Sequence, residues 1–198
     1  QTNGLGNPPS KYEKILRQIG IMLEQGHYSP KKIDDNFSKE VFSKYIESID
    51  PDKQFFLQPD ITQLKKFEDK IDDEIHGAPL QSFYAIDDIY QKRLQEYLAS
   101  YKELLTQPFD FTGNETYVDD KDKTVFAATE KDRKEMWRKK LKYQVLVRYA
   151  DLIAANEKNK GNKEKVRTDA DMEKEAREKV LQINDRIAER LKTKFSEE

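Results

Sequence analysis

Few residues in this sequence are of types that could do chemistry, and their spacing forms no complete catalytic site. His27 and His76 are the only histidines, and each lies at the end of a predicted helix. No second histidine or cysteine lies nearby in sequence to complete a site. At a helix C-terminus a histidine usually serves as a surface or capping group. We therefore expect neither histidine to be catalytic.

An acidic turn, Asp119-Asp120-Lys121-Asp122, raises the question of a calcium site. An EF-hand loop needs glycine at its sixth position and a bidentate glutamate at its twelfth. Counted from Asp120, these positions hold Val125 and Lys131, so the match fails. We predict a solvated turn and no metal site.

A basic and aromatic segment follows this turn and resembles a nucleic-acid-binding patch. It contains Lys131, Arg133, Lys134, Trp137, Arg138, Lys139, Lys140, Lys142 and Tyr143. Asp132 and Glu135 interrupt the positive charge, and the net charge of the whole chain is −2. We predict a solvated helix face with a buried tryptophan and no nucleic-acid partner.

Other catalytic motifs are missing from the sequence. There is no G-x-S-x-G, no P-loop and no G-x-G-x-x-G, and the absence of cysteine removes thiolate nucleophiles and thiolate metal ligands. We assign no catalytic, cofactor-binding or metal-binding residue, and we expect no cofactor. On its residues alone, this chain is not a complete enzyme.

The elements that would position such residues are predicted to be amphipathic helices. Charged residues make up 37% of the chain and hydrophobic residues 36%, a composition typical of long helices with one solvated face. Apolar residues recur at steps of three and four, and no apolar run approaches the roughly 18 residues of a membrane-spanning helix. The predicted fold is all-α, an irregular bundle of about six helices.

The apolar spacing, prolines and glycines set the helix boundaries. We predict helices over residues 11–25, 32–49, 59–76, 80–107, 129–155 and 171–195. Residues 80–107 are predicted to form the longest, most aromatic and central helix. The expected buried stripe of the first helix is Tyr12, Ile15, Leu16, Ile19, Met22 and Leu23.

The same signals suggest how the chain is divided. Residues 1–10 are predicted to be a flexible lead-in, residues 11–155 a helical domain, residues 156–170 a polar linker, and residues 171–198 a C-terminal helix. That last helix has a narrow apolar seam through Val180, Ile183, Ile187, Leu191 and Phe195. Such a seam fits a single partner helix or a segment outside this chain.

Two stretches resemble a known family. One is the helix carrying Phe37, Phe42 and Tyr45 with the corner Gln54-Phe55-Phe56-Leu57, and the other is residues 108–117, which read PFDFTGNETY. In order and spacing, most of residues 11–196 resemble the N-terminal domain of the tail-specific protease, also called the carboxy-terminal processing protease. Residues 110–117 of the loop at 109–117 are the most specific part of this resemblance.

The resemblance implies a periplasmic serine endopeptidase that selects protein substrates by their C-terminal tails. Its PDZ domain and Ser/Lys dyad would lie beyond residue 198, so the resemblance assigns no catalytic residue to this chain. It implies a non-catalytic domain that contributes scaffold, substrate access or docking of a lipoprotein adaptor. The alternative is a free-standing helical adaptor module. Phe55-Phe56-Leu57 would be either a core corner, which we favour, or a surface facing the protease.

Overall fold

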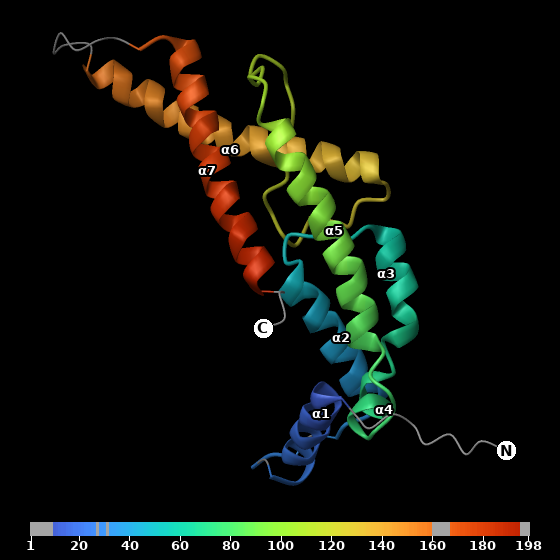
Figure 1. The fold of residues 1–198 in the computed structure, drawn as a ribbon. Helices are drawn as coiled ribbons and strands as arrows, with labels where there is room; N and C mark the ends of the chain where they lie inside the picture. The colour runs from blue at the N-terminus through green and yellow to red at the C-terminus, as the bar shows by residue number, and fades with distance from the viewer. Residues whose placement is uncertain (1–9, 27, 31, 160–166, 195–198) are drawn as a thin grey trace. The chain divides into compact units, whose positions relative to one another are not determined.

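A computed structural model describes residues 10–26, 28–30, 32–159 and 167–194 of the 198-residue chain. This part of the chain is helical and contains no β-strand (Figure 1), which confirms the predicted all-α fold. The helices are α1 (Lys11–Ile21), α2 (Asp35–Ile49), α3 (Gln58–Leu64), α4 (Ile71–Ile75), α5 (Ser82–Leu104), α6 (Glu130–Asn159) and α7 (Asp169–Lys194). A π-helical turn (Met22–Gly26) continues α1, and a 3-10 turn (Lys65–Phe67) follows α3.

Several sequence-based expectations fall outside the described residues. These are the first nine residues of the predicted lead-in, His27, residues 160–166 of the predicted linker, and Phe195 at the end of the predicted seam. Helix α6 runs to Asn159, and α7 begins at Asp169.

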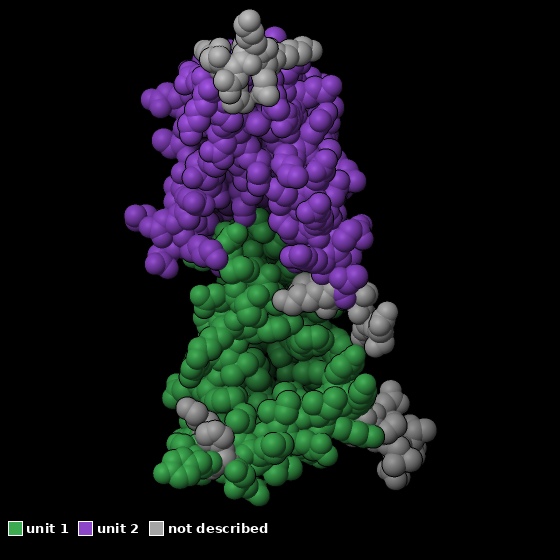
Figure 2. All heavy atoms as spheres, turned by 90° about the vertical axis from the view of Figure 1, so that its left-hand side faces the viewer, with its two compact units in different colours: residues 1–92 green, residues 93–198 purple. Residues whose placement is uncertain are grey.

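The chain folds as two compact units, residues 1–92 and residues 93–198 (Figure 2). Helix α5 runs from the first unit into the second, so its first half packs in one core and its second half in the other. It was predicted to be the longest helix, and this is wrong: α6 has 30 residues and α5 has 23. Residues 156–159 lack apolar side chains, which is why apolar spacing places the end of α6 at residue 155 rather than at Asn159.

The corner after α2 lies in the core of the first unit. Asp50 is buried, and its carboxylate accepts hydrogen bonds from the backbone N–H groups of Gln54 (2.8 Å), Phe55 (2.9 Å) and Phe56 (3.0 Å). Phe55 and Phe56 are 2% and 0% exposed, and the ring of Phe55 meets Tyr90 edge-on at 5.5 Å. The favoured reading of Phe55-Phe56-Leu57 as a core corner is confirmed.

The single helix predicted over residues 59–76 is wrong, because the chain breaks between α3 and α4. Ser38 of α2 supplies the reason. Its hydroxyl accepts a hydrogen bond from the backbone N–H of Asp72 (2.7 Å) and donates one to the Asp72 carboxylate (2.6 Å). A side chain from another helix thus satisfies an N–H at the start of α4. Apolar spacing over residues 59–76 predicts five inward positions, Ile61, Leu64, Phe67, Ile71 and Ile75. Four of them are buried, and Phe67 is half-buried.

The expected buried stripe of the first helix is also wrong. Tyr12, Ile15, Ile19 and Met22 are 43%, 44%, 47% and 68% exposed, and the only buried residue of α1 is Gly20. Helix α1 contacts α4 along a different edge from the one its apolar spacing suggests. The spacing of apolar residues therefore predicted an apolar face of α1 correctly, but it did not predict that this face is exposed.

The second unit is built on the packing of α6 against α7 and the last part of α5. Trp137 of α6 is 1% exposed, which confirms the prediction of a buried tryptophan. Its ring contacts that of Tyr97 of α5 edge-on, with ring centroids 5.2 Å apart. The predicted seam of α7 is partly wrong, because Ile187 is exposed. The buried line of α7 is Met172, Ala176, Val180, Asn184 and Ala188, of which only Val180 belongs to the predicted seam.

Candidate functional site

The loop at residues 109–117, which the sequence reading singled out, is anchored where it leaves α5. Arg177 of α7 donates hydrogen bonds to the carbonyl oxygens of Leu105 (3.0 Å) and Thr106 (2.9 Å). Glu173, one helical turn earlier, pairs with Arg177 at 3.2 Å and accepts the backbone N–H of Phe109 at 3.1 Å. These bonds satisfy carbonyl groups that the end of α5 leaves free. They also fix the direction in which the loop begins.

A tight turn follows this anchor. The Asp110 carboxylate accepts hydrogen bonds from the backbone N–H (2.8 Å) and the hydroxyl (2.7 Å) of Thr112. These bonds favour the ionised form, so they lower the pKa of Asp110. The Asp-Phe-Thr sequence is therefore an Asx turn, in which a short acidic side chain takes the place of a backbone acceptor.

Ion pairs fasten the far side of the loop to α6. The Glu115 carboxylate lies 2.5 Å from Nη2 of Arg138 and 2.5 Å from Nζ of Lys142. Arg138 and Lys142 are four residues apart and so lie on one face of α6. Their hydrogen bonds lower the pKa of Glu115 to about 2, so the carboxylate stays ionised at neutral pH.

Aromatic side chains complete the attachment of the loop to α6. Phe111 stacks on Tyr149 with ring centroids 5.5 Å apart and an 18° angle between the rings, and Tyr117 lies 5.3 Å from Tyr143. Lys142 Nζ lies 5.9 Å from the centre of the Phe111 ring. Phe111 and Tyr117 thus hold the loop on the helical body.

Between the loop and α6 lies an open pocket of about 360 Å³, which we call the loop pocket. Its wall combines aromatic and aliphatic surface with two lysines and small loop residues. It is lined by Phe111, Gly113, Glu115, Thr116, Tyr117, Lys139, Lys142, Tyr143 and Leu146. Such a wall can hold an apolar side chain while a lysine or a backbone group meets a polar atom of the same ligand. None of its lining residues is a nucleophile paired with a base.

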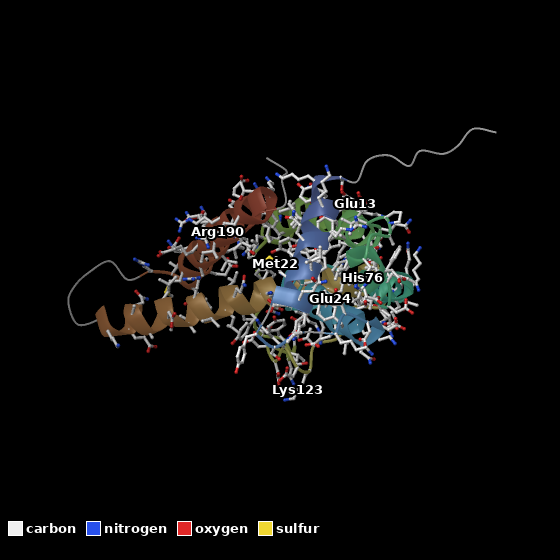
Figure 3. The ribbon with its side chains drawn as sticks, turned by 90° about the horizontal axis from the view of Figure 1, so that it is seen from below. Glu13, Met22, Glu24, His76, Lys123 and Arg190 are labelled. Atoms are coloured by element: carbon white, nitrogen blue, oxygen red, sulfur yellow. The ribbon has the colours of Figure 1, made fainter. Side chains whose placement is uncertain are left out.

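The residues considered for chemistry in the sequence lie elsewhere or are engaged in structure. His76 is the C-cap residue of α4 and lies 3.0 Å from the Glu24 carboxylate (Figure 3), which confirms a surface or capping role. In the acidic turn, Asp120 accepts the backbone N–H of Asp122 and pairs with Lys123 at 2.9 Å. Within the described ranges, no cluster of three or more His, Asp or Glu side chains could hold a metal ion.

Three cations of the basic segment of α6 form ion pairs within the chain. Arg133 is 1% exposed and pairs with Glu96 of α5, while Arg138 and Lys142 hold Glu115. These ion pairs are not among the contacts predicted from the sequence. The four-residue spacing of Arg138 and Lys142, opposite an acidic loop, was the one signal that could have suggested them.

Comparison with known proteins assigns this architecture to a family. The family model described as "Tail specific protease N-terminal domain" matches residues 20–197. A tail-specific protease from Haemophilus influenzae is 31% identical over 125 residues, which cover 63% of this chain. The match spans 18% of that protein's length. Separately, no helix in the described part of the chain is long and apolar enough to cross a membrane. The chain belongs to the family of tail-specific protease N-terminal domains.

Proposed function

We propose that this chain is the N-terminal, substrate-receiving part of a periplasmic serine endopeptidase that selects proteins by their C-terminal tails. In this proposal, a PDZ domain and a Ser/Lys dyad lie beyond Glu198 in the whole polypeptide. The chain itself cleaves nothing. It binds a section of an unfolded protein substrate and leaves the cutting to the catalytic part.

The observation that carries this proposal is the loop pocket. The 109–117 loop is fixed at both ends, by Glu173 and Arg177 on one side and by Arg138 and Lys142 on the other. A loop held in this way keeps its pocket open without a ligand, and a preformed site loses less entropy on binding. Tyr143 and Leu146 are each 40% exposed at the pocket wall and offer apolar surface to an extended chain.

The first experiment tests the family role of the whole protein. Reading the gene past Glu198 should give a PDZ and a Ser/Lys protease region, and the purified 198-residue chain should cleave no substrate with an apolar C-terminal tail. A stop codon directly after Glu198 would favour the free-standing adaptor module instead. Cleavage by the purified chain would refute the non-catalytic role.

A second experiment tests the loop pocket in the whole protease. The double substitution Tyr143→Ala and Leu146→Ala removes apolar contact surface, so KM for an unfolded tailed protein should rise by about fivefold or more while kcat stays unchanged. Lys134→Ala, at an exposed position of the same helix outside the pocket, should change neither constant. An unchanged KM in the double variant would exclude the pocket from substrate binding. If a lipoprotein adaptor, rather than the substrate, uses the pocket, the defect should appear only when the adaptor is added.

A further inference from the structure

An apolar stripe on α1 and the π-helical turn is exposed, and we refer to it as the α1 stripe. It consists of Tyr12, Ile15, Ile19 and Met22, each more than two-fifths exposed. Their steps of three and four residues place them on one side of the helix, over about 15 Å of its length. Single exposed apolar residues are ordinary on a protein surface, but a continuous stripe of this kind marks a contact surface.

Helix α1 cannot turn this stripe inward, because the opposite edge of the helix already packs against α4. A Cβ at Gly20 would overlap Cγ2 of Ile75, so the backbone of α1 at Gly20 lies directly against the Ile75 side chain of α4. This close approach is available to glycine alone. Helix α1 therefore contacts α4 along its Gly20 edge.

Polar bonds from the same edge hold this orientation. Glu13 accepts the backbone N–H of Leu80 at 3.1 Å, Arg17 donates to the carbonyl of His76 at 3.4 Å, and Glu24 pairs with His76 at 3.0 Å. Figure 3 shows Glu24 beside His76 at this junction, with Met22 in the same turn. The acidic side chains of α1 and its turn are thus used on the inner edge.

The charge left along the α1 stripe is positive. Lys11 and Lys14 are exposed on one flank of the stripe, and neither lies within ion-pair distance of a carboxylate in the described part of the chain. Further along the same flank, Gln18 and Gln25 are exposed amides. Two lysines followed by two amides form a localised charge pattern. A membrane-surface helix instead carries cations along its whole polar face.

We propose that the α1 stripe docks an amphipathic helix whose apolar face is bordered by carboxylates. The apolar side chains of the two helices would interlock in the helix-in-groove manner, and the carboxylates would meet Lys11 and Lys14. This interaction is separate from the loop pocket, which lies in the other compact unit.

The test uses the 198-residue chain and two synthetic helical peptides with the same leucine stripe, one flanked by glutamates and the other by lysines. Fluorescence anisotropy should show the glutamate peptide binding about tenfold more tightly or better at low salt. Ile19→Asp should abolish binding, and Lys11→Glu with Lys14→Glu should reverse the preference between the peptides. Ser43→Asp, which adds the same charge at an exposed site of α2, should leave binding unchanged. Circular dichroism should show that all these variants remain folded.

Other outcomes would overturn the proposal. Equal binding of the two peptides would show that the α1 stripe does not discriminate between them by charge. Binding that survives Ile19→Asp would show that the α1 stripe is not the binding site. Sedimentation as a dimer that Ile19→Asp converts to a monomer would make a second copy the occupant. Flotation with phosphatidylglycerol vesicles, without peptide binding, would make the stripe a membrane contact.

Discussion

Glu115 illustrates how much of the loop pocket depends on a single residue. Its carboxylate meets Arg138 and Lys142, and these contacts lower its pKa to about 2 from an unfolded value near 4.5. A carboxyl group with a lowered native pKa stabilises the fold when ionised. That contribution is complete above about pH 4.5 and is lost as the pH falls toward 2.

We therefore predict that Glu115→Gln removes a pH-dependent part of the stability. The free energy of unfolding of the wild-type protein should exceed that of the variant by a constant amount above about pH 4.5, and the difference should shrink as the pH falls toward 2. Urea titrations from pH 7 to pH 3 measure this difference. Glu103→Gln is the matched control, because Glu103 is exposed. A difference between wild type and Glu115→Gln that does not change with pH would contradict the ion-pair account.

Gly20 provides a prediction in which two effects oppose each other. In a solvated helix, Gly→Ala stabilises by about 1 kcal/mol. At Gly20 the new methyl group would overlap Cγ2 of Ile75, and such overpacking costs about 1–3 kcal/mol. We expect Gly20→Ala to destabilise the protein and to weaken the bonds from Glu13 and Arg17 to the α4 region. Gly26→Ala, with no atom within 4 Å of its new Cβ, should be neutral or stabilising. Thermal unfolding measures both effects: Tm should fall for Gly20→Ala and should stay the same or rise for Gly26→Ala.

At the scale of elements, buried polar groups define the packing of α7. Asn184 is 3% exposed, accepts the hydroxyl of Tyr97 at 2.9 Å, and donates to the carbonyl of Val180 at 2.9 Å. Burial raises the pKa of Tyr97 to about 12, so its hydroxyl keeps the proton that it donates. The hydrogen bond between Tyr97 and Asn184, together with apolar contact, therefore fixes the register of α5 against α7.

Removing Asn184 should therefore cost more than the loss of its own contacts. Asn184→Ala leaves the Tyr97 hydroxyl without this acceptor, and we expect a loss of about 1–3 kcal/mol in unfolding free energy. Gln182→Ala, at an exposed position of α7, should stay within about 0.5 kcal/mol of wild type. A double-mutant cycle with Tyr97→Phe isolates the interaction. Additive effects of the two substitutions would argue against the bond.

Elements whose structure is determined by local apolar spacing could be predicted from the sequence. The corner at Phe55-Phe56-Leu57, the helix before it and the start of the helix after it follow from proline positions and aromatic burial. The prediction was wrong where a contact with a residue distant in sequence determines the local structure. Ser38 capping α4, Gly20 turning α1 outward, and Glu115 meeting Arg138 are all contacts between residues far apart in the chain. The loop at 109–117 could be singled out, but its pocket required the α6 side chains to be placed.

At the scale of the whole molecule, α5 is the element shared by the two compact units. It gives Ile86 and Tyr90 to the first core, and Leu94, Tyr97 and Tyr101 to the second, all buried. Unfolding one unit would expose apolar side chains of the shared helix and remove packing from its other half. The two units should therefore unfold together, although each has its own core.

Trp137, the only tryptophan, makes this cooperativity measurable because it reports on the second unit alone. In the wild-type protein, Trp137 fluorescence and far-ultraviolet circular dichroism should give coincident thermal transitions. Lys92→Pro, at an exposed position in the middle of α5, breaks the helix at a cost of about 3 kcal/mol and should separate the two transitions. Lys92→Ala should keep them coincident. Transitions that already differ in the wild-type protein would mean that α5 links two units that unfold independently.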